Sequence, residues 1–181
     1  MSANQNNIFK HRVDYSGLVI ELVSDDYQLL EIDFVKGKKI KDSDRIPDPI
    51  KKGVLFLDDY FNGKKSKIEI ILNTKVSGNQ LTDKSNLLYL DMTGYTEKEI
   101  MVYKELLKVE SGKKISYNEL AVKSGIPKGA RFAGNCMAGN RFPVIIPCHR
   151  VIKTDGSLGN YSGGVGIKEL LLKHEQSAST K

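Results

Sequence analysis

A thiol and an imidazole stand side by side in the segment Pro147–Val151, directly after the apolar run Val144–Ile146. A thiolate is a strong nucleophile, but a free cysteine with a pKa near ~8.5 is mostly protonated at neutral pH. His149 is the obvious base for Cys148. Neighbours on a strand point to opposite faces, so a bridging water would help these two side chains to exchange a proton. With only two cysteines in the chain, the pair indicates a reactive site and not a disulfide framework.

A catalytic interpretation needs a third group, because a carboxylate must orient the histidine. Glu169 and Glu175 in the last predicted helix are the candidates, and their spacing does not choose between them. The simpler interpretation is a small buried cysteine beside a structural histidine. That interpretation would prevail for a bare Cys-His pair, so the surrounding sequence has to decide.

The surrounding sequence concentrates positive charge. Residues 113–150 contain seven basic residues against one acid, Glu119, whereas the rest of the chain contains 21 basic and 21 acidic residues. The net charge of +6 therefore lies in the one segment that ends on the Cys-His pair. Such a patch is typical of a polyanion partner, although a solvated basic face would show the same lysines. The basic residues are Lys113, Lys114, Lys123, Lys128, Arg131, Arg141 and Arg150.

Two capping boxes divide this region into helices. Each has the form Ser/Thr-x-x-Glu, which predicts a helix start, and the helices are expected over 96–109 and 116–123. The tight connection Ser124–Pro127 leads into a further predicted helix, from about Lys128 to Ala138. Helix, short turn and helix form the helix-turn-helix pattern, which a generic helix hairpin would also produce.

The composition of that further helix is unusual. Glycine costs roughly 1 kcal/mol relative to alanine inside a helix, so its glycines favour a backbone that must come close to something bulky. Close packing against another helix is an equally good explanation on composition alone. Arg131 is the only charge beyond the first turn. The small residues are Gly129, Ala130, Ala133, Gly134, Ala138 and Gly139.

The N-terminal half is predicted to contain strands and one helix. Leu18–Val23 and Leu29–Val35 flank a turn rich in aspartate, which indicates a hairpin. Pro49–Asn62 carries apolar residues at helical spacing, and Lys67–Leu72 is a third strand candidate. The polar stretch Asn73–Asp91 lacks periodicity, and we expect a connection there.

The Cys-His pair lies between two predicted elements. Val144–Ile146 predicts a buried strand. Beyond the pair, Gly159–Gly164 predicts a loop and Ile167–Glu175 a helix, and we expect Gln176–Lys181 to be a disordered tail.

The composition bounds the class of protein. Hydrophobic residues make up 40% and charged residues 28% of 181 residues, which fits one globular domain or two small ones sharing a core. No apolar run approaches the roughly 20 residues of a membrane span, and the first seven residues have no signal or transit pattern. A cytoplasmic, reducing location is expected, nuclear in a eukaryote, because oxidation would silence a reactive thiol.

Taken together, these motifs resemble the O6-alkylguanine-DNA alkyltransferase family. The resemblance is strong over about 95–175, whereas the first 75 residues match only in pattern. It implies an α+β fold: a small ribonuclease-H-like antiparallel sheet with a helix over 1–90, packed on a mostly helical, winged-helix-like domain over 91–181. The segments that carry it are Pro147–Val151, Ser116–Tyr117, Ala130–Arg131, Gly139–Asn140 and Gly159–Gly164.

The family resemblance implies DNA repair. Its members move the alkyl group of O6-methylguanine, and less readily of O4-methylthymine, irreversibly to their own cysteine. The implied partner is double-stranded DNA containing O6-alkylguanine, bound by a monomer without a cofactor or a membrane. Some relatives bind zinc through N-terminal Cys and His; here His11 is the only such residue in the N-terminal half, so we expect no metal.

The resemblance also implies roles for the catalytic residues. Cys148 would accept the alkyl group, and His149 would deprotonate it through a water. Glu175 would orient the histidine, preferred to Glu169 because Lys173–Glu175 matches the family's ending. Together His149 and Glu175 would hold the apparent pKa of the thiol below ~8.5. Asn140 would hold the turn before the active-site strand.

Further residues would contact DNA and the base. Arg131 would fill the gap left by the flipped base, and Tyr117 would crowd the 3′ phosphate. The small residues Ala130 and Gly134 would let the helix approach the minor groove. The base pocket would be formed by Met137, Tyr161, Ser162 and the backbone of Cys148 and Val151.

Two other classes of function compete with repair. A non-catalytic DNA-binding module would fit the basic helices, but such relatives replace the cysteine that this chain retains as Cys148. A Cys-His hydrolase would need an oxyanion hole and a peptide groove, which a basic helix-turn-helix region does not favour. Cys136 is interpreted as a small packing residue.

Overall fold

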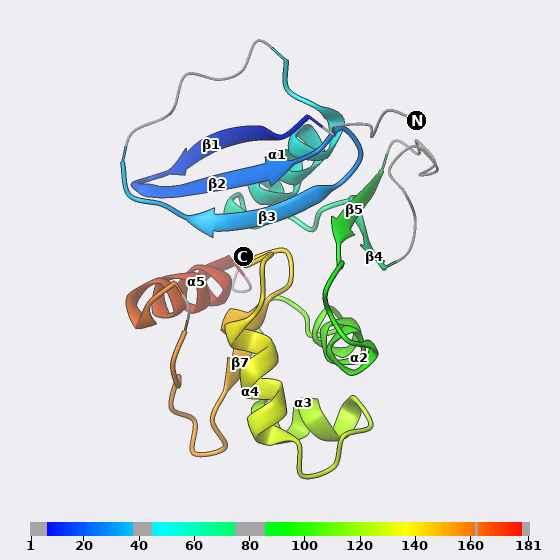
Figure 1. Cartoon of the computed structure of the whole chain (residues 1–181). Helices are drawn as coiled ribbons and strands as arrows, with labels where there is room; N and C mark the ends of the chain where they lie inside the picture. The colour runs from blue at the N-terminus through cyan, green and yellow to red at the C-terminus, as the bar shows by residue number, and fades with distance from the viewer. Residues whose placement is uncertain (1–6, 38–44, 75–85, 162, 179–181) are drawn as a thin grey trace, which may run out of the picture. The chain divides into compact units, whose positions relative to one another are not determined.

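The computed structural model describes residues 7–37, 45–74, 86–161 and 163–178. The chain divides into two compact units, Met1–Thr93 and Gly94–Lys181. The expected mixture of helices and strands in one α+β chain is confirmed (Figure 1). In the described ranges, no helix is both long and apolar enough to cross a membrane.

The first unit is a five-stranded sheet in the order β1-β2-β3-β5-β4. Strands β1 (Phe9–Tyr15), β2 (Leu18–Ser24) and β3 (Leu29–Phe34) form antiparallel hairpins. Strand β5 (Leu87–Asp91) runs parallel to both β3 and β4 (Glu69–Asn73). The sheet is therefore mixed, and the expected all-antiparallel sheet is wrong. The expected connection over 73–91 is also wrong at its end, where β5 lies; residues 75–85 lie outside the described ranges.

Helix α1 (Asp48–Phe61) lies across one face of this sheet (Figure 1). Its close approach depends on Gly53, because a Cβ there would lie 2.6 Å from Leu22 Cδ2. Tyr15 on β1 stacks on Phe61 and donates a hydrogen bond to an Asp58 oxygen at 2.8 Å, which ties the helix end to the sheet. The core of the unit comprises Ile20, Leu22, Leu29, Ile32, Ile50, Leu57, Leu88 and Leu90.

The second unit begins with three helices. They are α2 (Glu97–Leu106), α3 (Tyr117–Lys123) and α4 (Ala130–Ala138). Both expected capping boxes are present, each with its two reciprocal hydrogen bonds. Helix α4 begins two residues later than expected, because Lys128 has a left-handed φ of 64° and Gly129 is the N-cap.

The segment that leads to the cysteine differs from the expected strand. Val144 has a φ of 72°, which breaks the extended backbone, and only an isolated bridge joins Pro143 to Ile146. A 3₁₀ turn then spans Cys148–Arg150. The predicted buried strand is therefore wrong, although its residues are buried as expected.

Two short strands and a last helix complete the unit. Strands β6 (Ile115–Ser116) and β7 (Val151–Ile152) pair in parallel, which joins the start of α3 to the end of the 3₁₀ turn. Helix α5 (Val165–Ala178) runs three residues beyond the expected end, so the expected disordered tail is wrong over 176–178. Residues 179–181 lie outside the described ranges. The core includes Tyr103, Leu106, Leu120, Ala133, Phe142, Ile146 and Leu171.

Candidate active site

The sulfur of Cys148 is buried and held by an asparagine. Cys148 opens the 3₁₀ turn and is 1% exposed. Asn140 Nδ2 donates to its Sγ at 3.0 Å and to the Ile146 carbonyl at 2.9 Å. The Asn140 Oδ1 accepts from the Phe142 amide at 3.0 Å. One side chain thus links the end of α4 to the backbone and sulfur of the cysteine segment.

The surroundings of the sulfur act on its protonation in opposite directions. Burial raises the pKa of Cys148 above its ordinary value, while the hydrogen bonds that it forms with Asn140 and Tyr161 and the charge of Lys168 lower it. Burial is the largest of these effects, so the direction is opposite to the expected one. The groups that oppose burial are also different from the expected His149 and Glu175.

Behind the cysteine, His149 forms a buried pair with Glu175. The His149 Nε2 lies 2.7 Å from Glu175 Oε1, and neither side chain is exposed. Arg150 donates to the same carboxylate from Nε at 3.0 Å and 3.1 Å and from Nη2 at 2.8 Å. The Gly112 amide adds a bond to Oε2 at 2.8 Å. Glu169, the other candidate, is half exposed and pairs with Lys173, so the structure brings Glu175 to the histidine.

This cluster fixes the charge of its members. Burial alone would raise the pKa of Glu175, but hydrogen bonds from His149 and Arg150 outweigh it and lower the pKa to about 2. Burial lowers the pKa of His149, and Glu175 opposes this only in part. A carboxylate and a neutral imidazole are the states that follow near pH 7.

A buried lysine that the sequence analysis did not identify lies in the same region. Lys168 on α5 is 0% exposed and donates from Nζ to the carbonyls of Val151 and Leu158. Its Nζ lies 5.9 Å from the ring centres of both Tyr117 and Tyr161. Burial lowers the pKa of Lys168 to about 8, and negative charge on the sulfur opposes that shift. In sequence, a lysine on a terminal helix gives no sign of burial.

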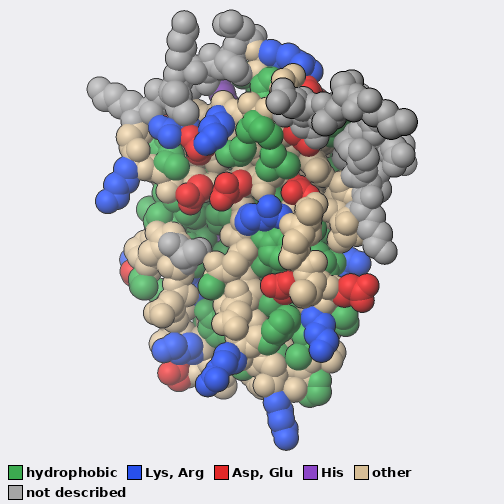
Figure 2. Space-filling model, in the orientation of Figure 1, with side chains coloured by type: hydrophobic (Ala, Val, Ile, Leu, Met, Phe, Trp, Pro, Cys, Tyr) green, Lys and Arg blue, Asp and Glu red, His purple; other side chains and the backbone are tan. Residues whose placement is uncertain are grey.

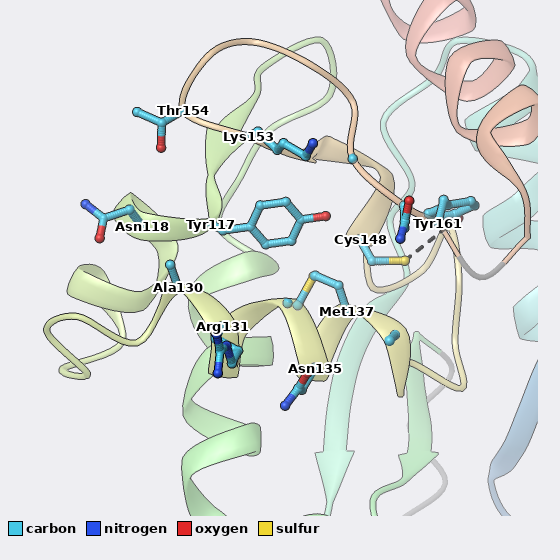
Figure 3. A pocket seen from close by; sticks show the side chains of 14 residues that line it. Tyr117, Asn118, Ala130, Arg131, Asn135, Met137, Cys148, Lys153, Thr154 and Tyr161 are labelled. Carbon is cyan, nitrogen blue, oxygen red and sulfur yellow. Dashed lines mark hydrogen bonds between the residues drawn. The ribbon is translucent and has the colours of Figure 1, made fainter.

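The sulfur lines a pocket of about 780 Å³ between α3, α4 and the loop after β7. Figure 3 shows the Tyr117 ring extending across it with the hydroxyl toward Cys148, while Met137 approaches from α4. The Tyr161 hydroxyl lies 3.8 Å from the sulfur. Burial and the charge on Cys148 raise the pKa of Tyr117, so its hydroxyl stays protonated.

The structure gathers most of the predicted site residues around this pocket. Cys148, Tyr117, Met137 and Tyr161 line it, as do the expected DNA-contacting residues of α4. Val151 is buried and does not line it; its carbonyl accepts from Lys168. Ser162 lies outside the described ranges. The α4 residues are Ala130, Arg131 and Gly134, and the lining residues not predicted from sequence are Asn118, Asn135, Ala138, Lys153, Thr154, Gly159 and Asn160.

Basic side chains lie around this end of the second unit. In the space-filling view, Lys and Arg side chains project over the part that carries α3 and α4 (Figure 2). Arg150 is not among the accessible ones, because it is 9% exposed and bound to Glu175. Arg141 packs its guanidinium over the Tyr95 ring at 4.9 Å. The exposed charge is thus smaller than the count over 113–150 suggests. Among the described residues, no group of three His, Cys, Asp or Glu side chains could hold a metal ion.

A buried thiol beside a His–Glu pair, with two helices joined by a tight turn, defines a protein whose candidate reactive group is a cysteine. A family model described as the DNA binding domain of 6-O-methylguanine DNA methyltransferase matches residues 97–177. The methylated-DNA–protein-cysteine methyltransferase of Methanosarcina barkeri is 33% identical over 169 residues, which cover 87% of this chain and 90% of that protein. This chain belongs to the methylated-DNA–protein-cysteine methyltransferase family.

Other relatives agree over parts of the chain or over the fold. The human protein of the same name is 51% identical over 75 residues, and the match covers 41% of this chain but only 36% of the human protein. An O6-methylguanine methyltransferase from Mycobacterium tuberculosis has the same fold, with a TM-score of 0.71, 24% identity and coverage of 95% and 94%. A structure of the protein from that organism in complex with DNA gives 0.69 at 27% identity, with 92% of each chain covered.

Proposed function

We propose that this protein repairs DNA by moving the alkyl group of O6-alkylguanine, and less readily of O4-alkylthymine, to Cys148. One observation carries the proposal: a buried, hydrogen-bonded thiol belongs to the lining of a pocket of about 780 Å³ beside the paired helices α3 and α4. Relatives that are similar to this chain in sequence are named methylated-DNA–protein-cysteine methyltransferases. The transfer is irreversible, so each molecule acts once.

In the transfer step, the sulfur attacks the alkyl carbon as the bond from that carbon to O6 breaks. The electron pair of that bond stays on the guanine, and the thiol proton passes to His149 through a bridging water. A histidine whose pKa is lowered is neutral and can accept it. With Nε2–H donated to Glu175, the lone pair is on Nδ1. The carboxylate then stabilises the imidazolium that forms.

The proton must leave the thiol during attack, because burial disfavours a thiolate in the free protein. Asn140 and the Lys168 charge lower the free energy of the negative sulfur as it develops. Preorganised donors of this kind need no rearrangement during the reaction. Lys168 thus supports the step without touching the substrate.

An alkyl carbon inside a duplex is out of reach, so the nucleotide must rotate out at a cost of a few kcal/mol. Arg131 fills the vacated space, and Tyr117 crowds the 3′ phosphate and favours rotation. Met137 and Tyr161, which line the pocket, wall the extruded base. Lys153, which lines the pocket, adds a positive charge for the backbone phosphate.

The two parts of the chain have different roles. Residues 91–181 form a winged-helix-like domain that carries both DNA binding and alkyl transfer. Residues 1–90 form a ribonuclease-H-like domain. The protein acts as a monomer on double-stranded DNA inside the cell, in the cytoplasm or in a nucleus, and it needs no cofactor or metal.

Intact mass spectrometry tests the proposal directly. Incubation with an excess of duplex containing O6-methylguanine should add one methylene unit per molecule, located on Cys148. Cys148→Ala should abolish the gain, whereas Cys136→Ala should preserve it, because Cys136 does not line the pocket. More than one repaired base per molecule, or a methyl group on Cys136, would contradict the proposal.

A further inference from the structure

Tyr95 occupies a specific position at the end of α4. Its hydroxyl donates to the Gly139 carbonyl at 2.7 Å and accepts from the Arg141 amide at 3.2 Å and from Arg141 Nε at 3.3 Å. A phenol has one donor and two acceptor sites, so this hydroxyl uses its full capacity. The Arg141 guanidinium also covers the Tyr95 ring, which holds the ring in place.

These contacts bracket Asn140. The Gly139 carbonyl belongs to the peptide group before Asn140, and the Arg141 amide belongs to the peptide group after it. One hydroxyl therefore fixes both peptide groups that flank the residue. The Asn140 side chain in turn holds the sulfur of Cys148 at 3.0 Å. Hydrogen bonds from Tyr95 to the flanking peptide groups, the Asn140 residue between them and the bond from its side chain thus connect Tyr95 to the reactive sulfur.

The arrangement goes beyond ordinary helix capping. Tyr103, whose ring meets that of Tyr95 edge-on, donates to the Cys136 carbonyl at 2.7 Å and satisfies a carbonyl in the last turn of α4. The Tyr103 hydroxyl also interacts with the Tyr95 side chain. Each tyrosine satisfies a carbonyl near the end of α4, but only Tyr95 bonds to both peptide groups that flank Asn140.

We propose that Tyr95 is a positioning residue, which sets the reactivity of Cys148 by holding Asn140 at hydrogen-bond distance from the sulfur. The inference rests on the proposed alkyl transfer only for its biological consequence, because it concerns the reactivity of the thiol itself. Removing the hydroxyl frees the two peptide groups and lengthens the bond from Asn140 to the sulfur. The negative sulfur then loses a donor that favours it.

The test is the pH dependence of alkylation by iodoacetamide, a small uncharged reagent, followed at Cys148 by mass spectrometry in the full-length protein. Tyr95→Phe keeps the ring and removes only the hydroxyl. We expect the pH midpoint of the alkylation rate to rise. The rate at pH 7 should fall by about three- to tenfold, the range that one hydrogen bond produces. Tyr15→Phe, the matched control, removes the hydroxyl that donates to Asp58 in the first unit and should lower the unfolding temperature without moving the pH profile. Overlapping profiles for Tyr95→Phe and the parent would overturn the proposal.

A double-mutant cycle tests whether Tyr95 acts through Asn140. Asn140→Ala should by itself raise the pH midpoint of alkylation. Adding Tyr95→Phe should change that midpoint no further, because Tyr95 acts on the sulfur only through Asn140. Additive shifts would overturn the proposed route. The parent's reaction with O6-benzylguanine, measured in parallel, separates the two proposals. If the parent reacts with iodoacetamide but not with O6-benzylguanine, the alkyl-transfer function is contradicted. The iodoacetamide profiles of Tyr95→Phe and the parent still test the role of Tyr95 independently.

Discussion

Cys136 and Cys148 are both buried, yet their surroundings assign them different chemistry. Burial, with the charge of Glu99, raises the pKa of Cys136 to about 11, and its sulfur does not line the pocket. Cys148 is equally buried, but a donor and a buried cation oppose the effect of burial. Reactivity is therefore decided by which polar groups reach the sulfur, and not by exposure.

Glu175 is the residue on which the buried cluster depends. Its folded-state pKa of about 2 lies below the ordinary 4.5, so the folded protein binds the proton less readily than the unfolded chain. The stability it contributes is fully present above pH 4.5 and is lost as the pH falls toward 2. Its carboxylate also compensates the buried guanidinium of Arg150.

Glu175→Gln should therefore lower the free energy of unfolding at pH 7 by about 3 kcal/mol or more, because Arg150 stays buried without its partner charge. The variant should also lose less stability than the parent between pH 4.5 and 2. Urea unfolding at a series of pH values measures both effects. Glu169→Gln is the control, since its exposed pair with Lys173 should change stability by less than about 0.5 kcal/mol. Equal losses for the two variants would contradict the assignment.

Helix α4 combines low intrinsic helix propensity with a position at the pocket. Gly134 illustrates the conflict: a Cβ there would lie 4.0 Å from Tyr117 Cδ1, with no closer neighbour. The free protein thus has room for alanine, which would favour the helix by roughly 0.5–1 kcal/mol. Under the proposed function, the missing side chain at Gly134 leaves room for DNA to approach the helix closely.

Gly134→Ala should accordingly raise the unfolding midpoint while weakening binding to duplex DNA. Calorimetry and a fluorescence-anisotropy titration with damaged duplex would measure the two effects. Gly129→Ala provides the contrast, because a Cβ there would lie 2.7 Å from the Ile126 carbonyl oxygen and should destabilise the fold. Unchanged DNA affinity in Gly134→Ala would show that DNA does not approach the helix at this residue.

Across the chain, the charge follows the division into units. Residues 1–93 contain 14 basic and 14 acidic residues, whereas residues 94–181 contain 14 basic and 8 acidic ones, so the second unit carries the net charge of +6. A protein that neutralises phosphates releases counterions, and its affinity then falls as salt rises. The second unit should therefore supply the salt-dependent part of the DNA affinity.

The logarithm of duplex affinity should fall linearly with the logarithm of salt concentration, by about 0.9 for each phosphate contacted. Lys153→Gln should reduce the magnitude of that slope by about 0.9, the value of one phosphate contact, because Lys153 lines the pocket. Lys67→Gln, an exposed change in the first unit, should leave it unchanged. A slope that responds to Lys67 and not to Lys153 would place the DNA on the other unit.

Features encoded within a few residues could be predicted from the sequence. The two capping boxes, at Thr96 and Ser116, place the starts of α2 and α3 correctly, because the bonds that define them join residues three apart. The pentapeptide around Cys148 likewise singled out a residue that lines the pocket. These patterns are local, so they can be interpreted without knowledge of the rest of the fold.

Features that depend on distant partners required the tertiary structure. Strand β1 is largely polar, so it is identified as a strand only by its pairing with β2. Strand β5 is likewise identified only by its pairing with β3 and β4. The apolar run before Cys148 reads as a strand, yet Val144 takes a left-handed φ, which is rare for a β-branched residue. The sheet order and this bend are set by packing across the chain.

The same distinction applies to the site. The sequence by itself determined the nucleophile candidate and its neighbouring histidine, because adjacency and composition are visible in one dimension. Spacing alone left Glu175 and Glu169 open, and the family resemblance preferred Glu175, which the tertiary structure brings to His149. Only the tertiary structure shows that Lys168 is buried and bonded to two carbonyls, and that Tyr95 contacts both peptide groups beside Asn140. Each of these contacts joins residues between 10 and 46 positions apart. No local pattern encodes that choice, because it follows from how the helices of the second unit pack.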